Sequence, residues 1–330
     1  MKNTEIKINP VIAEVTRGAI VESRHRGAYC VMDKSGKQIL AEGDLKTLIY
    51  PRSAIKAFQC LPVIESGAAN RFGLNDEEIA LCCSSHSGEA EHVRVAHSIL
   101  RKSGIDEACY ECGAHAPTFK QAAYQLVRDG LEPQQIHNNC SGKHAGMLAL
   151  AKQLNADHHN YVLPDHPVQK AIAKTIERMC GVDLAIAPMG VDGCSVPTWA
   201  IPLANMALGF ARLANAENPA ALRIINAARA HPFMIAGTGR FDTRVMQAVP
   251  RLFLKTGAEG VYCGCIPHAG LGFALKCDDG ATRAAEVASI SVVLKLDVWT
   301  EVERATLAGF QHETFINWRK IEVGEVHAKL

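Results

Sequence analysis

The spacing of hydrophobic residues predicts strands near both ends of the chain and helices in its middle. Apolar segments at 28–32 and 38–41 flank a polar turn at 33–36 that ends in glycine, a pattern typical of a β-hairpin. After Ser53, apolar residues recur every three positions up to Glu65, which predicts a helix with one buried face.

The rest of the chain follows the same division. Further helices are expected at 91–100, 117–129, 145–152, 167–180, 203–214 and 219–230, and strands at 260–264, 272–277 and 288–296. The segment after Trp318 is either a last strand or weakly ordered. This order predicts an α/β protein of the α+β type, in which an antiparallel sheet containing both chain ends packs against a central helical cluster. We expect a single domain over 1–330, with sheet segments at about 8–50 and 255–330 and the helical cluster at about 51–254.

Composition excludes several classes of function. Of the 330 residues, 48% are hydrophobic and 21% are charged, and the net charge is +1, so no basic surface for nucleic acid is predicted. No apolar stretch reaches the roughly 18 residues that a membrane helix needs. The first ten residues lack the apolar core of a signal peptide, so we expect a cytoplasmic protein.

The 12 cysteines are expected to be free thiols. Cys82 and Cys83 are adjacent, Cys263 and Cys265 flank a glycine, and most others lie in apolar runs. Such placement favours buried thiols in a reducing compartment over a disulfide framework.

Ser53 and Lys56 form the first candidate site. Their three-residue spacing places a hydroxyl and an amine on one face of a helix. Lysine accepts a proton from serine only when it is neutral, and lowering its pKa from ~10.4 to ~7 needs burial or nearby positive charge. A second lysine, Lys255, is a candidate source of that charge. The alternative is a serine cap followed by a surface lysine.

Two further motifs follow in order, Ser85-His-Ser87 and Lys255-Thr-Gly257. Each one alone is no more than a turn or a helix end. Serine acyl-transfer enzymes of the penicillin-recognising type carry Ser-x-x-Lys, a Ser-x-Asn-like turn and Lys-Thr-Gly in this order. This chain departs from that pattern at Ser87, where asparagine is usual.

A second constellation contains Cys140, Lys143 and Cys194, on two polar turns that contain glycine. Two thiolates suit a soft metal such as zinc. The chemistry of the side chains alone favours His144 as the third ligand, because imidazole binds zinc far more often than lysine does. The alternative is a pair of free thiols.

Longer segments resemble the rhizobial-type L-asparaginases, also called class 3 or asparaginase II. The resemblance covers nearly the whole chain and is carried by residues 15–23, 51–56, 84–89, 111–115, 138–144, 163–167 and 191–194.

The resemblance implies a fold like that of serine β-lactamases and penicillin-binding proteins, and hydrolysis of L-asparagine to L-aspartate and ammonia. Ser53 with Lys56 would form one Ser–Lys tandem, and Ser85 with Lys255 a second, with Lys276 as the alternative second lysine. Cys140, Lys143 and Cys194 would hold zinc, with Asp192 supporting the site and lysine taking the place of His144. Members of the family are homodimers.

Three other functions compete with this one. A penicillin-recognising hydrolase would share the Ser–Lys chemistry but lacks its Ser-x-Asn motif here. A glutaminase remains open, because one methylene changes discrimination in a pocket by only about 1–3 kcal/mol. A zinc-stabilised scaffold without catalysis would keep the thiol cluster and make Ser53 dispensable.

Overall fold

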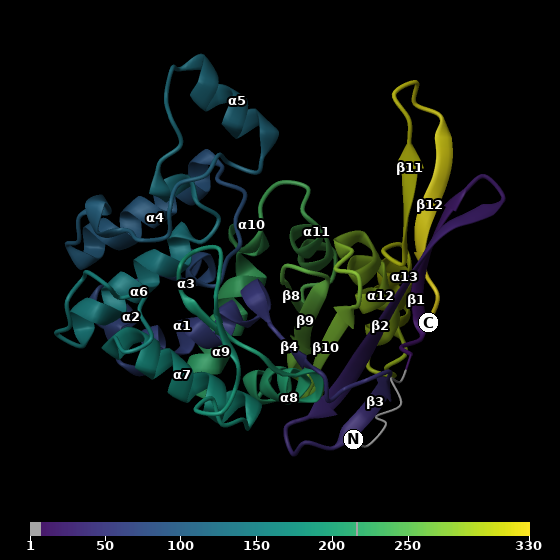
Figure 1. The fold of residues 1–330 in the computed structure, drawn as a ribbon, viewed down its shortest axis with the longest axis horizontal. Coiled ribbons are helices and arrows are strands. Elements are labelled where there is room, and N and C mark those ends of the chain that lie inside the picture. Colours follow the sequence, from purple (N-terminus) through teal and green to yellow (C-terminus); the bar gives the residue numbers. More distant parts are fainter. Residues whose placement is uncertain (1–7, 216) are drawn as a thin grey trace, which may run out of the picture.

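The protein is built around one antiparallel sheet, seen in a computed structural model that describes residues 8–215 and 217–330 (Figure 1). The strands run in the order β11-β12-β1-β2-β10-β9-β8, and β3 pairs with β2. They are β1 (Val11–Arg17), β2 (Ile20–Asp33), β3 (Gln38–Glu42), β8 (Phe253–Thr256), β9 (Val261–Ile266), β10 (Leu271–Cys277), β11 (His312–Ile316) and β12 (Glu322–Ala328). The N-terminal strands lie between C-terminal ones, which confirms the expected sheet containing both chain ends.

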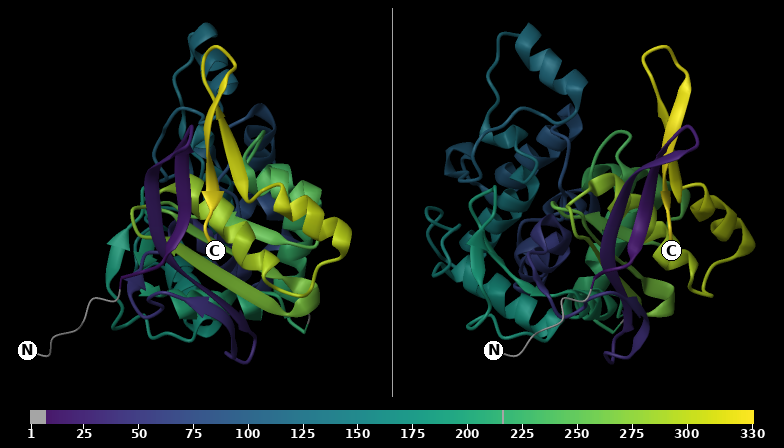
Figure 2. Two further views of the ribbon diagram at one scale, coloured as in Figure 1. Left: turned by 90° about the vertical axis from the view of Figure 1, so that its right-hand side faces the viewer. Right: turned by 45° about the vertical axis from the view of Figure 1, so that its right-hand side comes forward.

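The helical cluster lies beside the sheet (Figures 1 and 2). It contains the 3₁₀ turn η1 (Arg52–Ile55) and helices α1 (Lys56–Glu65), α2 (Ala68–Arg71), α3 (Asp76–Cys82), α4 (Ala90–Ser103), α5 (Lys120–Arg128), α6 (Ser141–Gln153), α7 (Pro167–Cys180), α8 (Leu203–Leu213), α9 (Pro219–Ala230), α10 (Pro232–Ile235) and α11 (Phe241–Ala248). None of the helices in the described part of the chain combines the length and the hydropathy that a membrane span requires.

One expected strand is wrong. Residues 288–296 belong mainly to α12 (Thr282–Leu294), which packs against β1, β9, β10 and β12, and α13 (Glu301–Ala308) follows it. Helix α12 is buried along most of its length, so its sequence is apolar on several faces and lacks the periodicity that distinguishes a helix from a buried strand.

Two short strand pairs lie within the helical region and escape the sequence pattern. Strand β4 (Leu48–Ile49) pairs with β7 (Ile201–Pro202), and β5 (Met189–Val191) pairs with β6 (Pro197–Trp199). The β5–β6 hairpin matters for the site, because its turn contains Asp192 and Cys194.

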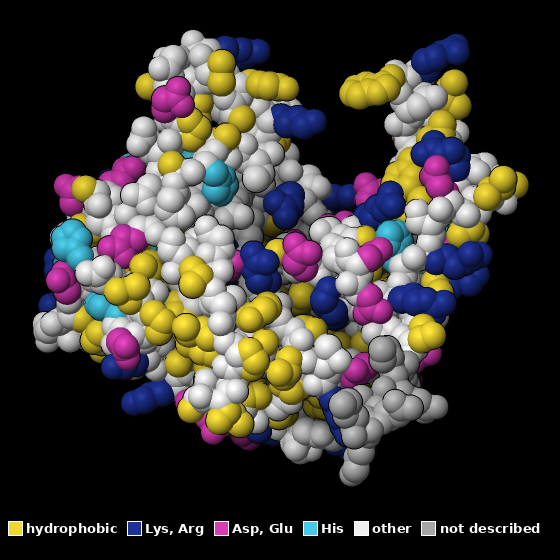
Figure 3. All heavy atoms as spheres, viewed as in Figure 1, with side chains coloured by type: hydrophobic (Ala, Val, Ile, Leu, Met, Phe, Trp, Pro, Cys, Tyr) yellow, Lys and Arg dark blue, Asp and Glu magenta, His cyan; other side chains and the backbone are white. Residues whose placement is uncertain are grey.

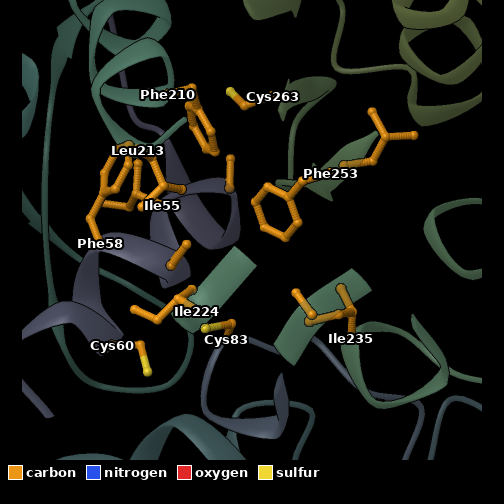
Figure 4. Packing of buried hydrophobic residues seen from close by; sticks show 14 of the residues in the cluster. Ile55, Phe58, Cys60, Cys83, Phe210, Leu213, Ile224, Ile235, Phe253 and Cys263 are labelled. Atoms are coloured by element: carbon orange, nitrogen blue, oxygen red, sulfur yellow. The ribbon is translucent and has the colours of Figure 1, made fainter. Parts of the chain in front are cut away.

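Aromatic packing connects the helical cluster to the last strand of the sheet (Figure 4). The ring centroid of Phe210 on α8 lies 4.9 Å from that of Phe58 on α1 and 6.4 Å from that of Phe253 on β8. Side chains two apart on a strand share a face, so Lys255 points from β8 toward the same helices as Phe253. All 12 cysteines are unpaired, and all except Cys109 are buried.

Candidate active site

Lys56 lies fully buried at the first position of α1. Its Nζ donates to the Ser84 carbonyl oxygen at 2.6 Å, to Ser85 Oγ at 2.9 Å and to Cys140 Sγ at 3.1 Å. These three acceptors match the three donors of an ammonium group. A buried lysine thus joins the Ser85 turn to the thiol cluster.

Lys255 approaches the same serine from the sheet. Its buried Nζ lies 2.9 Å from Ser85 Oγ and 2.9 Å from the Thr256 carbonyl oxygen. Burial lowers the pKa of the Lys255 amine to about 7, the Asp242 carboxylate opposes that shift, and the positive charge of Lys56 adds to it. Near neutral pH a large fraction of Lys255 is therefore neutral, as a proton acceptor requires.

Ser85 is held between the two amines by its backbone. Its N–H donates to the Ile235 carbonyl oxygen at 2.9 Å, and its side chain is buried. The turn that follows is fixed as well, because the Glu89 carboxylate accepts from Thr238 N at 2.8 Å and from Thr238 Oγ1 at 2.6 Å. Ser85 Oγ is thus a fixed link between Lys56 and Lys255.

Ser53 lies in η1, three residues before Lys56, and the Lys56 N–H donates to the Ser53 carbonyl oxygen. Residues three apart in a 3₁₀ turn lie on the same side, so the predicted shared face is present. The Ser53 side chain is half-buried, and among the described residues its hydroxyl has no hydrogen-bond partner. Its neighbour Arg52 has φ +51°, a left-handed conformation that is uncommon outside glycine.

The Lys255-Thr-Gly segment packs directly on the Ser53 turn. A Cβ added to Gly257 would lie 2.7 Å from the Pro51 carbonyl oxygen and 3.3 Å from Ala54 Cβ. Only glycine allows strand β8 to come this close to η1. The two motifs are therefore neighbours in space, although some 200 residues separate them in the chain.

The thiol cluster lies beside Lys56. Lys143 Nζ donates to Cys194 Sγ at 2.9 Å, and all three side chains of the predicted ligand set are buried. A hydrogen bond from Cys140 lowers the pKa of the Cys194 thiol to about 5, in spite of burial, and the charge of Lys143 contributes to this shift. The same hydrogen bond, together with burial, raises the pKa of Cys140 to about 12. The cluster therefore contains one thiolate, one thiol and one charged amine.

Asp192 connects this cluster to the Ser53 turn. Its Oδ1 accepts from Arg52 Nε at 2.8 Å and from the Gly193 N–H at 2.8 Å. Burial acts to raise the pKa of the Asp192 carboxyl, but the charges of Lys143 and Arg52 leave it below its usual value.

Two of the sequence alternatives lie apart from these groups. Lys276 on β10 donates to the carbonyl oxygens of Glu259 and Cys277, so Lys255 is the lysine that meets Ser85. His144 Nδ1 lies 2.7 Å from the Tyr161 hydroxyl, while the neighbouring Lys143 contacts Cys194.

Sequence reasoning missed two groups that shape the site. Arg52 stands inside the recognised Pro51–Lys56 segment, but its backbone conformation and its ion pair with Asp192 have no sequence signature. Asp242 is buried and its Oδ1 accepts from the Thr256 N–H at 2.8 Å, next to Lys255. The glycines at 237 and 239 mark this region as a turn, which is the one signal that points toward it.

The arrangement suits acyl transfer to a serine. It contains an accessible hydroxyl, two buried amines joined through a second hydroxyl, and one amine whose pKa lies near neutrality. These are the parts that nucleophilic catalysis with proton transfer requires.

Several solved structures resemble this chain at low sequence identity, among them a carboxypeptidase and a β-lactamase. A D-alanine carboxypeptidase from Burkholderia cenocepacia is 12% identical, with a TM-score of 0.39, over 86% of this chain and 93% of that one. A β-lactamase from Mycobacterium bovis is 12% identical, with a TM-score of 0.27, over 92% of this chain and 96% of that one. No curated protein was found to match.

The family comparison is much stronger. The model of the L-asparaginase II family matches residues 13–328, nearly the whole chain, and includes every residue of the two clusters described above. The resemblance inferred from the sequence segments is thereby confirmed. The chain belongs to the L-asparaginase II family, a family of hydrolases.

Proposed function

We propose that this protein hydrolyses L-asparagine to L-aspartate and ammonia through a covalent intermediate on Ser53. The observation that carries the proposal is the pair of buried lysines, Lys56 and Lys255, that meet at Ser85 Oγ beside the Ser53 turn. Membership of the L-asparaginase II family supports the amide substrate.

Ser53, rather than Ser85, is the proposed nucleophile. The Ser85 side chain is buried, and its Oγ is already hydrogen-bonded to the amines of both Lys56 and Lys255. The Ser53 side chain is half-buried and its hydroxyl is free of hydrogen bonds among the described residues, so it can reach a substrate.

The proton path runs through Ser85. Neutral Lys255 accepts the Ser85 proton, and Ser85 takes one from the Lys56 ammonium, which leaves Lys56 neutral. Lys56 then accepts the Ser53 proton as Ser53 Oγ attacks the side-chain amide carbon of asparagine. This order follows from the pKa of Lys255, which burial brings to about 7.

The remaining steps balance the reaction. The tetrahedral intermediate collapses, the C–N bond breaks, and the departing nitrogen takes a proton back along the same path and leaves as ammonia. Water then attacks the β-aspartyl ester, and aspartate is released as Ser53 regains its proton. Backbone N–H groups near Ser53 are proposed to stabilise the oxyanion, usually a large contribution in acyl transfer.

Cys140, Lys143 and Cys194 are proposed to hold zinc. The donor set fits in type, because the Cys194 thiol is already ionised and the buried Lys143 amine contacts it at 2.9 Å. Lys143 and Cys140 would each release a proton when the metal binds, since only the neutral amine and the thiolate are ligands. When bound, zinc would supply positive charge that keeps both thiols ionised. The ion pair between Asp192, next to this cluster, and Arg52, next to Ser53, would let the metal site orient the Ser53 turn.

The proposed activity is tested by ammonia release from L-asparagine and from L-glutamine. Ring opening of a β-lactam, which releases no ammonia, is followed separately by its ultraviolet absorbance. We expect asparagine to be the best substrate, and Ser53→Ala to abolish turnover while the near-ultraviolet circular dichroism is unchanged. Ser87→Ala is the matched control, since that hydroxyl donates to the Ala236 carbonyl oxygen away from both lysines. Retained turnover in Ser53→Ala would overturn the assignment of Ser53 as the nucleophile. A preference for glutamine or for the β-lactam would overturn the assignment of asparagine as the substrate.

We also propose a homodimer that works in the cytoplasm. Helix α5 and the β11–β12 hairpin both project from the body (Figures 1 and 2), and they carry exposed apolar side chains that include Val127 and Trp318. Exposed apolar patches of this kind are typical of protein interfaces. The twelve unpaired cysteines suit a reducing compartment.

A further inference from the structure

Arg240 lies in the segment that joins the two halves of the Ser–Lys site. On one side of it, Ile235 and Thr238 hydrogen-bond the segment from Ser85 to Glu89. On the other side, Asp242 accepts from the Thr256 N–H, next to Lys255. The residues on either side of Arg240 in the chain therefore contact both the Ser85 segment and the Lys255 segment.

The backbone in this segment is tightly constrained. Gly237 has φ +119°, and a Cβ there would lie 2.5 Å from Glu89 Oε1 and 2.8 Å from Ser87 Oγ. The turn is thus pressed against the Ser85 segment, and the Arg240 N–H donates back to the Gly237 carbonyl oxygen at 3.3 Å. Arg240 follows directly at the start of α11, so its position relative to Ser85 is fixed.

The guanidinium of Arg240 is the group without a partner. Its side chain is half-buried, and within residues 8–215 and 217–330 it makes no hydrogen bond or ion pair. The positive charge of Arg240 lies close enough to Lys255, Tyr262 and Glu286 to lower the pKa of each of them. The guanidinium is therefore on the side of the segment that faces the interior. Lys and Arg side chains are visible in the hollow between the helical part and the sheet (Figure 3).

From these contacts we propose that Arg240 binds the α-carboxylate of the amino-acid substrate. An arginine offers paired N–H donors that match a carboxylate, and a half-buried one with none of them used is suited to a charged ligand. The inference rests on the proposed function and adds the group that selects a free amino acid over other amides. Arg240 acts in binding, and Ser53, Lys56, Ser85 and Lys255 remain the catalytic groups.

The test compares L-asparagine with its α-N-methylamide, in which a neutral amide replaces the α-carboxylate and ammonia is still released from the side chain. The wild-type protein should prefer L-asparagine. Arg240→Gln should lower kcat/KM for L-asparagine about 10- to 100-fold, mainly through KM, and leave kcat/KM for the methylamide nearly unchanged. Arg240→Lys should restore part of the preference, because it keeps the charge.

Arg244→Gln is the matched control. It lies one turn along α11, is exposed, and stacks on Phe310 with 5.5 Å between its guanidinium carbon and the ring centroid. It should keep the wild-type preference. Equal losses for both substrates in Arg240→Gln would assign Arg240 a structural role and overturn the inference. Wild-type protein that releases no ammonia from either substrate would instead overturn the proposed function.

Discussion

At the scale of single residues, the most consequential group is the Lys255 amine. It is fully buried, and that burial lowers its pKa to about 7. The sequence motif directed attention to Lys56 as the neutral amine, yet Lys56 meets three acceptors and Lys255 meets only two. We therefore assign the proton-accepting role at rest to Lys255.

Lys255→Met should remove activity and increase stability. An unfolded lysine keeps its proton up to about pH 10, while folded Lys255 loses it above about pH 7, so folding carries a cost that the methionine variant avoids. The cost is constant below pH 7 and declines as the pH rises toward 10. Urea unfolding should thus show the gain in unfolding free energy to be larger near pH 6 than near pH 9.

The same pKa governs the pH dependence of catalysis. In the wild-type protein, kcat/KM for asparagine should rise as the pH increases through about 7 and level off above it, because neutral Lys255 is required. A rate that is flat across this range, or that falls as the pH rises, would contradict the assignment of Lys255.

Cys140→Ser should release most of the bound metal from protein purified with zinc. The serine oxygen is a much poorer ligand for a soft metal than the thiolate. Metal content measured by mass spectrometry gives the answer without reference to activity. Cys180→Ser is the control, since that buried thiol lies on α7, outside the cluster. Equal zinc in the two variants would remove Cys140 from the ligand set.

At the scale of elements, the sequence predicted most of the architecture that positions the site. Helices at 167–180, 203–214 and 219–230 match α7, α8 and α9 to within a residue, because each has one apolar face and clear end signals. The strand predicted from the hydrophobic run at 288–296 was wrong, because a helix that is buried on several sides has no single apolar face by which to recognise it. The residues of the Ser–Lys motifs could be identified from the sequence. That they lie next to one another depends on β8 packing against η1, a contact between distant segments that no local sequence pattern predicts.

Gly257→Ala should disrupt this meeting of elements. The added methyl would press on the Pro51 carbonyl oxygen at 2.7 Å, so β8 or the Ser53 turn must move. We expect a loss of about 1–3 kcal/mol in unfolding free energy, and a larger proportional loss of activity. Gly190→Ala is the control, because its Cβ would make only ordinary contact with Tyr50 at 3.5 Å. Wild-type turnover in Gly257→Ala would show that the close approach is not needed.

At the scale of the whole molecule, the projection of helix α5 and of the β11–β12 hairpin from the body could not be predicted from the sequence. Helix α5 was predicted as a helix and the tail after Trp318 as a strand or as weakly ordered, yet nothing indicated that both would stand out from the body (Figure 1). Both segments carry exposed apolar side chains, and the proposed homodimer assigns them a contact.

Replacing these side chains should weaken self-association. If the proposed homodimer forms through these segments, Val127→Ser combined with Trp318→Ser should lower the mass toward that of a monomer in light scattering coupled to size exclusion, since both residues are exposed. Ile186→Ser, another exposed apolar change outside both segments, should leave the mass unchanged. A double variant with the wild-type mass would place any interface elsewhere.

The stack of Phe58, Phe210 and Phe253 has a practical consequence for how this enzyme fails when heated. These rings fasten α1 to β8, and so fix the spacing of Lys56 and Lys255 through hydrocarbon contacts rather than through loops. Ammonia production should then survive until the core itself melts, so thermal inactivation and loss of near-ultraviolet signal should follow one curve.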